Sequence, residues 1–178
     1  MARNIEIKAR ITNIEALLPL AQALADRAPE LILQDDTFFA CPHGRLKLRV
    51  FADGHGELIA YHRADATGPK TSDYLITPTA DPSGLRDALT RGLGTAGRVV
   101  KQRTLLLAGR TRIHLDRVEG LGDFLELEVV LRDGESETQG TAEAHALLDR
   151  LQIDASQLLA GAYVDLLQAS VDDTKPAP

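Results

Sequence analysis

Hydrophobic and polar side chains alternate strictly over residues 4–11, which is the pattern of a β-strand with one apolar face and one polar face. The period then changes, because Ile14, Leu17 and Ala21 repeat at the spacing of one helix face. Asn13 is a suitable N-cap residue for that helix. The chain is therefore expected to begin with a strand that leads directly into an amphipathic helix.

Later segments predict more strands, joined by tight turns and helices. Asp53 and Gly54 supply the turn of a first hairpin, and Gly109 separates the strands of a second pair. Asp81 and Gly94 are suitable residues to begin and end a helix after the first group of strands. This order predicts an α+β domain with a mostly antiparallel sheet. The further strands are expected at residues 45–51, 57–63, 71–77, 99–107, 111–118 and 124–131, and the further helices at 82–93, 138–151 and 154–169.

Composition is that of one folded domain, since 44% of the 178 residues are hydrophobic and 26% are charged. We expect this single domain over residues 1–170 and a mobile polar tail over residues 171–178. Cys41 is the one cysteine, so neither an intramolecular disulfide nor a cysteine-based zinc site is expected. No apolar stretch approaches the ~20 residues of a membrane span, and the first residues lack the apolar core of a signal peptide. The prediction is a cytoplasmic protein without a membrane partner.

Basic residues are concentrated in the strands although the net charge is −6, a balance that disfavours a general nucleic-acid binder. Nine of the 20 lysines and arginines lie at alternating positions of five predicted strands. Acidic residues and one histidine share these polar faces. The basic residues are Lys8, Arg10, Arg45, Lys47, Arg49, Arg63, Lys101, Arg103 and Arg112, and the others are Glu6, His114, Asp116, Glu126 and Glu128.

Two arrangements accommodate such charged faces, because the apolar faces opposite them must be covered by the helices. The charges point either to solvent, as cross-strand ion pairs, or into the lumen of a closed barrel. Clustered cations beside carboxylates suit a polyanion that binds together with a divalent metal. Arginine and lysine bind phosphoryl oxygens, and carboxylates are the ligands that Mg²⁺ or Mn²⁺ prefers.

Five short motifs follow one another along the chain, at residues 4–8 (NIEIK), 44–49 (GRLKLR), 101–103 (KQR), 112–122 (RIHLDRVEGLG) and 124–128 (FLELE). In this order they resemble the motifs of the CYTH domain, a family also called the triphosphate tunnel metalloenzymes. The family includes class IV adenylate cyclases, thiamine triphosphatases and inorganic triphosphatases. The resemblance covers nearly the whole chain, to a terminal helix around residues 163–167.

This resemblance implies an eight-stranded antiparallel barrel with helices outside, in which cations bind a triphosphate and acids bind Mg²⁺ or Mn²⁺. It also points to a homodimer. Arg10 and Arg45 match the motifs less closely and are expected at the tunnel mouth. The implied metal ligands are Glu6, Asp116, Glu126 and Glu128, the implied phosphate ligands are Lys8, Lys47, Arg49, Arg63, Lys101, Arg103 and Arg112, and the implied catalytic residues are Glu6, Lys8, Asp116 and Glu128.

One residue departs from the family pattern, because Asn4 occupies the position of the first glutamate in the opening Glu-x-Glu-x-Lys motif. An amide lacks the charge with which a carboxylate binds a metal, so weaker metal binding is expected there. His114 is either a general base or the partner of a neighbouring carboxylate. Tyr61 and Tyr74 either stack on an organic group or belong to the core or rim.

Three functions follow from the resemblance. The first is metal-dependent hydrolysis of inorganic tripolyphosphate or of an organic triphosphate such as thiamine triphosphate. The second is a class IV adenylate cyclase that converts ATP to cyclic AMP and pyrophosphate. The third is a module that binds polyphosphate or nucleotides without catalysis, which Asn4 keeps open.

Overall fold

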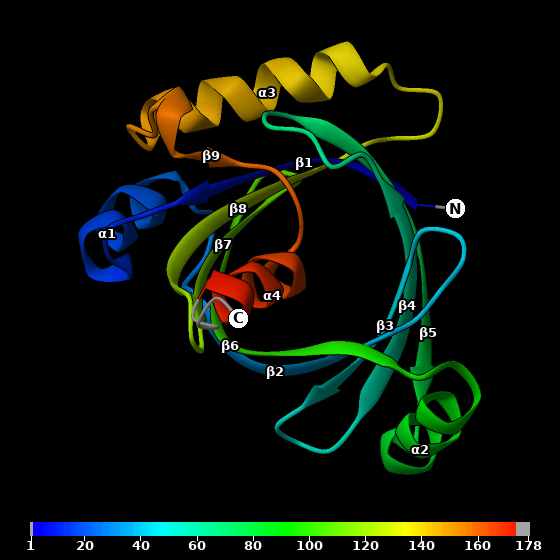
Figure 1. The fold of residues 1–178 in the computed structure, drawn as a ribbon. Helices are drawn as coiled ribbons and strands as arrows, with labels where there is room; N and C mark the ends of the chain where they lie inside the picture. Colours follow the sequence, from blue (N-terminus) through cyan, green and yellow to red (C-terminus); the bar gives the residue numbers. More distant parts are fainter. Residues whose placement is uncertain (1, 174–178) are drawn as a thin grey trace.

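Eight strands form a closed antiparallel barrel in the computed structural model, which describes residues 2–173 (Figure 1). Around the barrel the strands follow the order β5-β4-β3-β2-β6-β7-β8-β1, and β1 pairs with β5 to close it. The expectation of an eight-stranded antiparallel barrel is confirmed. The strands are β1 (Ala2–Arg10), β2 (Glu30–Phe39), β3 (Arg45–Phe51), β4 (Gly56–Arg63), β5 (Lys70–Thr79), β6 (Thr95–Ala108), β7 (Thr111–Val118), β8 (Gly122–Val130) and the two-residue β9 (Leu158–Leu159).

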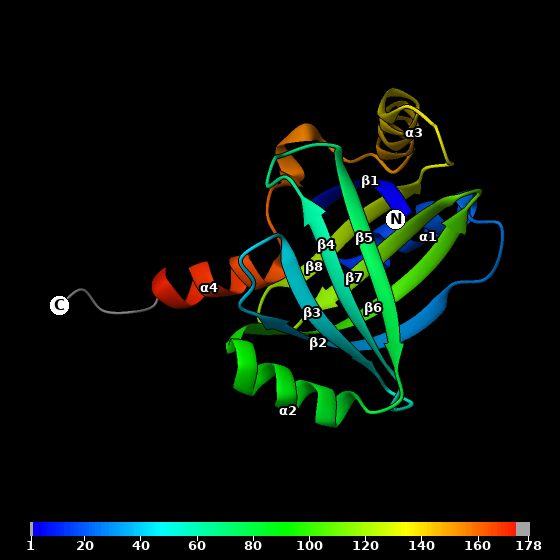
Figure 2. The same cartoon turned by 90° about the vertical axis from the view of Figure 1, so that its right-hand side faces the viewer.

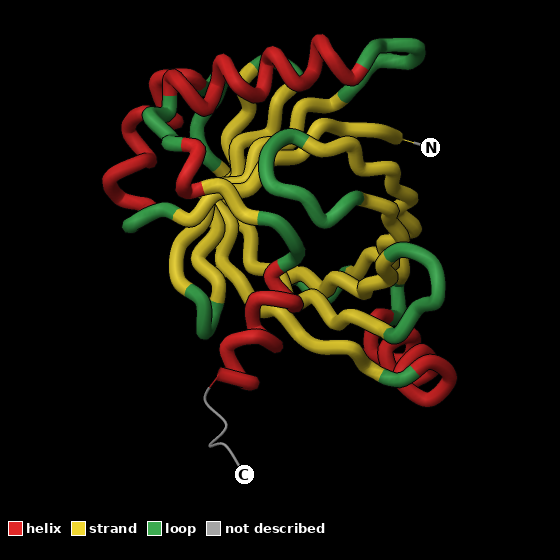
Figure 3. Tube along the Cα trace, turned by 45° about the horizontal axis from the view of Figure 1, so that its top comes forward, coloured by secondary structure: helices red, strands yellow, loops and turns green. Residues whose placement is uncertain are grey.

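The helices α1, α2 and α3 lie outside the barrel wall, whereas α4 lies at one end of the barrel (Figures 2 and 3). α1 (Ile14–Leu24) packs on β6 and β7, and α3 (Glu137–Arg150) packs on β1 and β8. α2 (Pro82–Leu93) lies against β2 and β3, and α4 (Tyr163–Asp173) packs on β6. None of the helices within residues 2–173 has the length and apolar character needed to span a membrane.

The strand β1 shows why the sequence folds in this way. Its odd-numbered residues Ile5, Ile7 and Ala9 are buried on the outer face of the wall, in the main hydrophobic core beneath the helices. Its even-numbered residues Glu6 and Lys8 line an internal cavity instead. The charged faces of the strands therefore point into the lumen of the barrel and not to open solvent.

The two edges of β1 have three partners, because β8 pairs along one edge while β5 and β9 share the other. β8 pairs with it from Asn4 to Arg10, β5 pairs with its first half and β9 pairs with Lys8 and Ala9. The short strand β9 thus continues the closure where β5 begins, and it brings the segment before α4 to the barrel wall.

Two regions differ from the sequence-based expectation. No element is predicted over the segment that forms β2. The helix predicted over residues 154–169 is wrong in its first half, where the chain forms a 3₁₀ turn (Ala155–Gln157) and β9. Gly161 then adopts a φ of 77°, a conformation that favours glycine, and α4 begins only at Tyr163. In the expected tail over residues 171–178, α4 continues to Asp173, and residues 174–178 lie outside the described part.

Candidate active site

A cavity of about 380 Å³ occupies the lumen of the barrel. All eight barrel strands contribute side chains to its lining, and Tyr163 of α4 and the preceding Ala162 add to it at one end. The lining contains all seven basic residues that the sequence predicts to bind phosphate: Lys8, Lys47, Arg49, Arg63, Lys101, Arg103 and Arg112.

Asp116 anchors the first pair of these cations. Its carboxylate accepts hydrogen bonds from Arg103 Nε at 2.7 Å and Lys101 Nζ at 3.2 Å, and also from the Tyr163 hydroxyl at 3.0 Å. Burial alone would raise the pKa of Asp116, but Arg103 and Lys101 hold it well below its usual value. Asp116 is fully buried behind the cations and is not part of the cavity lining. Its position is that of a structural partner of the basic wall.

Asp36 on β2 anchors a second pair in the same way. Lys47 Nζ and Arg49 Nε on β3 each lie 2.8 Å from its carboxylate oxygens. Burial opposes the ionised form, yet Arg49 and Lys47 hold the pKa of Asp36 well below its usual value. Each anchoring carboxylate therefore serves two cations, so both pairs keep positive charge in excess toward the lumen.

Burial of these ion pairs is unfavourable, and it lowers the pKa of the two lysines. Burial, with Arg103 close by, lowers the pKa of Lys101 to about 7. Burial and Arg49 lower the pKa of Lys47 in the same direction. An anionic ligand would favour the charged form of both lysines, since opposite charge raises the pKa of an amine.

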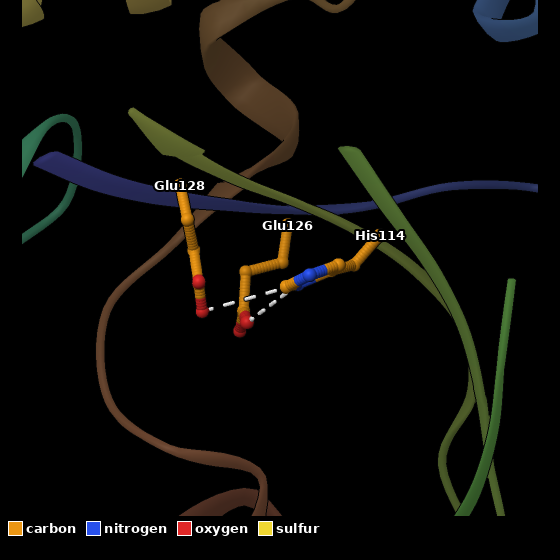
Figure 4. A group of neighbouring side chains, drawn as sticks. All are labelled: His114, Glu126 and Glu128. Carbon is orange, nitrogen blue, oxygen red and sulfur yellow. Dashed lines mark hydrogen bonds and ion pairs between the residues drawn. The ribbon is translucent and has the colours of Figure 1, made fainter. Parts of the chain in front are cut away.

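His114 on β7 and the glutamates Glu126 and Glu128 on β8 form a compact group of donor atoms (Figure 4). One ligand atom from each lies within 4.8 Å of the others, and His114 Nδ1 is 3.3 Å from Glu126 Oε1 and 3.9 Å from Glu128 Oε1. Burial, reinforced by Arg103, lowers the pKa of His114, which favours the neutral imidazole with its lone pair. Two carboxylates and an imidazole fit a divalent cation such as Mg²⁺ or Mn²⁺.

Glu6 lies opposite Glu128 in the β1–β8 register but interacts with cations rather than with the donor group. Arg63 forms a charge-assisted hydrogen bond to its carboxylate, and Lys8 Nζ is 3.6 Å from it. Lys8 also lies 2.8 Å from Glu126. Among the predicted metal ligands, the structure thus groups Glu126 and Glu128 with His114 and places Glu6 beside them. Asp116 lies behind Lys101 and Arg103, and Arg103 is also 3.1 Å from Glu126.

The remaining predicted residues are Arg112, which lines the cavity, and Arg45 and Arg10, which do not. Arg112 Nε lies 2.9 Å from Glu128 Oε2. Arg45 bridges to Asp165 on α4, outside the cavity lining, and Arg10 donates to the carbonyl of Leu121. The expected position of Arg10 and Arg45 at the mouth remains a prediction.

This lumen combines buried cation pairs with a carboxylate and histidine group, on the wall of an antiparallel barrel. The family model of the CYTH domain matches residues 2–163. The chain belongs to the CYTH domain family. Asn4 therefore departs from the motif of its own family, and its side-chain oxygen Oδ1 is buried without a hydrogen-bond partner among the described residues.

One curated protein and several solved structures are similar to this chain. The chain is 25% identical to adenylate cyclase CyaB of Aeromonas hydrophila, over 94% of this chain and 90% of that protein. The structure of PH1012 from Pyrococcus horikoshii superposes with a TM-score of 0.83 at 24% identity, covering 92% of this chain and 99% of that one. HpAC1 from Hippeastrum, an adenylyl cyclase candidate described as having a dominant triphosphatase activity, superposes with a TM-score of 0.66 at 15% identity, covering 100% and 98%.

Sequence reasoning missed two residues of this CYTH lumen. Asp36 lies on the strand that was not predicted, although an acidic residue between Gln34 and Phe38 in a β-rich segment is the available signal. Tyr163 was placed only within a terminal helix, yet its ring lies 4.2 Å from Lys8 Nζ and 5.0 Å from Lys101 Nζ. These cation–π contacts hold both ammonium groups beside the lumen.

Proposed function

We propose that the protein hydrolyses a triphosphate in the lumen of the barrel with a divalent cation. The observation that carries this proposal is the lining of one cavity by seven basic side chains together with the group of His114, Glu126 and Glu128. β3, with Lys47 and Arg49, stands four strands from β8, with Glu126 and Glu128, in a ring of eight. A polyphosphate between these walls would meet Lys47 and Arg49 on one side, and on the other side it would meet the donor group together with Lys8 and Arg112.

The basic side chains are fitted to bind and orient phosphates. Arg49 and Arg103 are each held by a carboxylate on the barrel wall, so their guanidinium groups are oriented before the ligand arrives. Such fixed charge stabilises the negative charge that develops during phosphoryl transfer without reorganisation. Lys47 and Lys101 add positive charge. A bound phosphate would raise the pKa of both lysines and so favour their charged forms.

His114, Glu126 and Glu128 would hold Mg²⁺ or Mn²⁺, since their donor atoms are grouped and face the cavity. When bound, the ion would supply Lewis-acid stabilisation of charge on the phosphoryl oxygens. Glu6 is next to this group. Its ion pairs with Arg63 and Lys8 limit the repulsion among the three neighbouring carboxylates.

A second candidate is cyclisation of ATP, which the relationship to adenylate cyclase CyaB favours. The lumen would bind the same triphosphate, but the attacking oxygen would be the substrate's own 3′-hydroxyl and pyrophosphate would leave. A protein that binds triphosphate without cleaving it is the third outcome to be distinguished.

The test is to measure orthophosphate, pyrophosphate and cyclic AMP released from tripolyphosphate, thiamine triphosphate and ATP, with Mg²⁺, Mn²⁺ or EDTA. We expect metal-dependent orthophosphate release that falls about 10²-fold or more in Glu126→Gln and Glu128→Gln. The exposed Glu137 on α3 supplies the matched control, Glu137→Gln, which should retain full activity. Cyclic AMP with pyrophosphate would replace the hydrolase with the cyclase, and binding without any product would overturn both.

A further inference from the structure

The carboxylates of the proposed metal site are already paired with cations of the protein itself. Glu126 lies 2.8 Å from Lys8 Nζ and 3.1 Å from Arg103 Nη2. Glu128 lies 2.9 Å from Arg112 Nε. Like charges repel strongly at such distances, so a divalent cation that binds these carboxylates must compete with the positive charges that the barrel supplies.

Two of these three cations have a second carboxylate outside the metal site. Arg103 donates two hydrogen bonds to Asp116, with distances of 2.7 Å and 2.6 Å. Lys8 Nζ lies 3.6 Å from Glu6 Oε1. Charge-assisted contacts of this kind hold a basic side chain in place. Each of the two cations therefore keeps a partner when the metal site binds an ion.

Arg112 has no such second carboxylate among residues 2–173. It lies directly opposite Glu128 in the β7–β8 register, and its one ion pair is with that glutamate. The pair is close but is not aligned as a hydrogen bond, since Nε is buried without a hydrogen-bond partner. Nη2 of the same guanidinium donates to the hydroxyl of Tyr74 on β5 over 3.3 Å, which is a long hydrogen bond. Of the three cations, Arg112 is therefore held least firmly.

The guanidinium of Arg112 also has room to turn toward a ligand. Its side chain lines the cavity and is 33% exposed, compared with 6% for Arg103. Arginine binds phosphate oxygens with the same donors that it uses for a carboxylate. One side chain can therefore pair with two anions in turn, which are Glu128 before a ligand binds and a phosphate oxygen afterwards.

We propose that Arg112 is an internal counter-ion of the metal site, which moves from Glu128 to the triphosphate when both ligands bind. This inference rests on the proposed function, because it assumes that Glu128 is a metal ligand and that the lumen binds a triphosphate. Without a triphosphate, Arg112 lowers the affinity of the site for a divalent cation. A triphosphate that attracts Arg112 removes this competition, and by linkage the metal ion strengthens triphosphate binding by the same factor.

The two ligands are measured separately, because divalent cations and triphosphates also bind each other in solution. Electron paramagnetic resonance titration gives the Mn²⁺ affinity without triphosphate, and isothermal titration calorimetry in EDTA gives the tripolyphosphate affinity. Arg112→Gln should bind Mn²⁺ about 10-fold more tightly than the native protein and tripolyphosphate about 10-fold more weakly. A side chain that only supported the fold would weaken both ligands, so the opposite directions identify the counter-ion.

Two controls separate this role from the general loss of a positive charge. Lys47→Gln removes a cation that is paired with Asp36 on the opposite wall, so it should weaken tripolyphosphate binding and leave the Mn²⁺ affinity unchanged. Arg117→Gln removes an exposed cation from the outer face of the same strand β7 and should change neither affinity. Arg112→Lys keeps the charge and should bind Mn²⁺ as the native protein does. Urea unfolding verifies each fold, and Arg112→Met replaces Arg112→Gln if that variant does not fold.

The counter-ion role and the proposed function fail in different ways. An unchanged Mn²⁺ affinity in Arg112→Gln, or an equal gain in Lys47→Gln, would overturn the counter-ion role while the triphosphatase remains. Tighter Mn²⁺ binding in Arg112→Gln without metal-dependent product release from the native protein would overturn the hydrolase and support the counter-ion. Failure of both the native protein and Arg112→Gln to bind Mn²⁺ would overturn both.

Discussion

The hydroxyl of Tyr163 donates a hydrogen bond to Oδ2 of Asp116, with 3.0 Å between the two oxygens. Tyr163 is the first residue of α4, and Asp116 is the carboxylate that also binds Lys101 and Arg103. The helix and the basic wall are therefore joined through one buried carboxylate. Burial, reinforced by Asp116, raises the pKa of Tyr163 well above its usual value, so the hydroxyl remains a donor.

Replacement of Asp116 is predicted to affect stability more than metal binding. Asp116→Asn removes the charge that two buried cations require, and we expect a loss of about 3–5 kcal/mol in the free energy of unfolding. Tyr163→Phe removes only the hydrogen bond and should cost about 1 kcal/mol. Urea denaturation measures both. If Asp116 were a metal ligand, Asp116→Asn would instead weaken Mn²⁺ binding to the same extent as Glu128→Gln.

Asp36 is predicted to act through Lys47 and Arg49. Asp36→Asn should raise KM for the triphosphate about 10-fold or more, because the two cations lose the carboxylate that orients them. Asp35→Asn is a close control, since Asp35 binds Arg86 and Arg98 and does not line the cavity. Steady-state kinetics measure KM for the two variants. Equal KM values would show that Asp36 does not contribute to triphosphate binding.

Triphosphate binding is predicted to take up a proton at pH 8. The pKa of Lys101 is about 7 in the free protein, so most of its amine is neutral at pH 8, and a bound anion raises that pKa. Binding should therefore weaken as pH rises above 7. Calorimetry in buffers of different ionisation enthalpy measures the uptake. Lys101→Arg keeps its charge throughout this range and should lower the proton uptake, whereas an unchanged uptake would assign the proton to another group.

Restoring the family residue at position 4 is predicted to strengthen metal binding. Asn4 is two residues from Glu6 on the cavity face of β1. Asn4→Glu should tighten Mn²⁺ about 10-fold by electron paramagnetic resonance titration, because each added carboxylate charge increases the affinity of an oxygen site. Asn4→Gln extends the side chain without adding charge and should bind as the native protein does. Equal affinities for all three proteins would place position 4 away from the ion.

The strand faces could be predicted because their pattern is unusual. Residues 4–11 place charges on one face and aliphatic side chains on the other, and burial of both faces is what a filled barrel requires. The strand β2 lacks this signal. Its outer face carries exposed Leu31 and Leu33 with Asp35, and its inner face carries Ile32 with Asp36, so polar and apolar residues occur on both faces and the alternation disappears.

The alternating pattern does not predict which polar side chains face the cavity and which are covered by their neighbours. Alternation places Asp116 and Glu126 on the same face, but only the register with neighbouring strands determines their partners. Asp116 lies opposite Arg103, which covers it, whereas Glu126 lies opposite His114 and faces the cavity. The helical spacing after Asp154 predicts a helix that does not form there, because Leu158 and Leu159 pair with β1 instead. Gly161 is the residue in the sequence that indicates the break.

The pairing of β1 with three later segments determines how much of the chain must be present before the barrel can close. The strand β1 pairs with residues 70–74, with residues 124–130 and with residues 158–159. Contacts so distant along the chain form slowly and carry a large loop-closure entropy. Until β8 emerges, the lysine and the glutamate of β1 have no complete lumen to line. The charged interior of this protein is therefore complete only when strands from widely separated parts of the chain have come together.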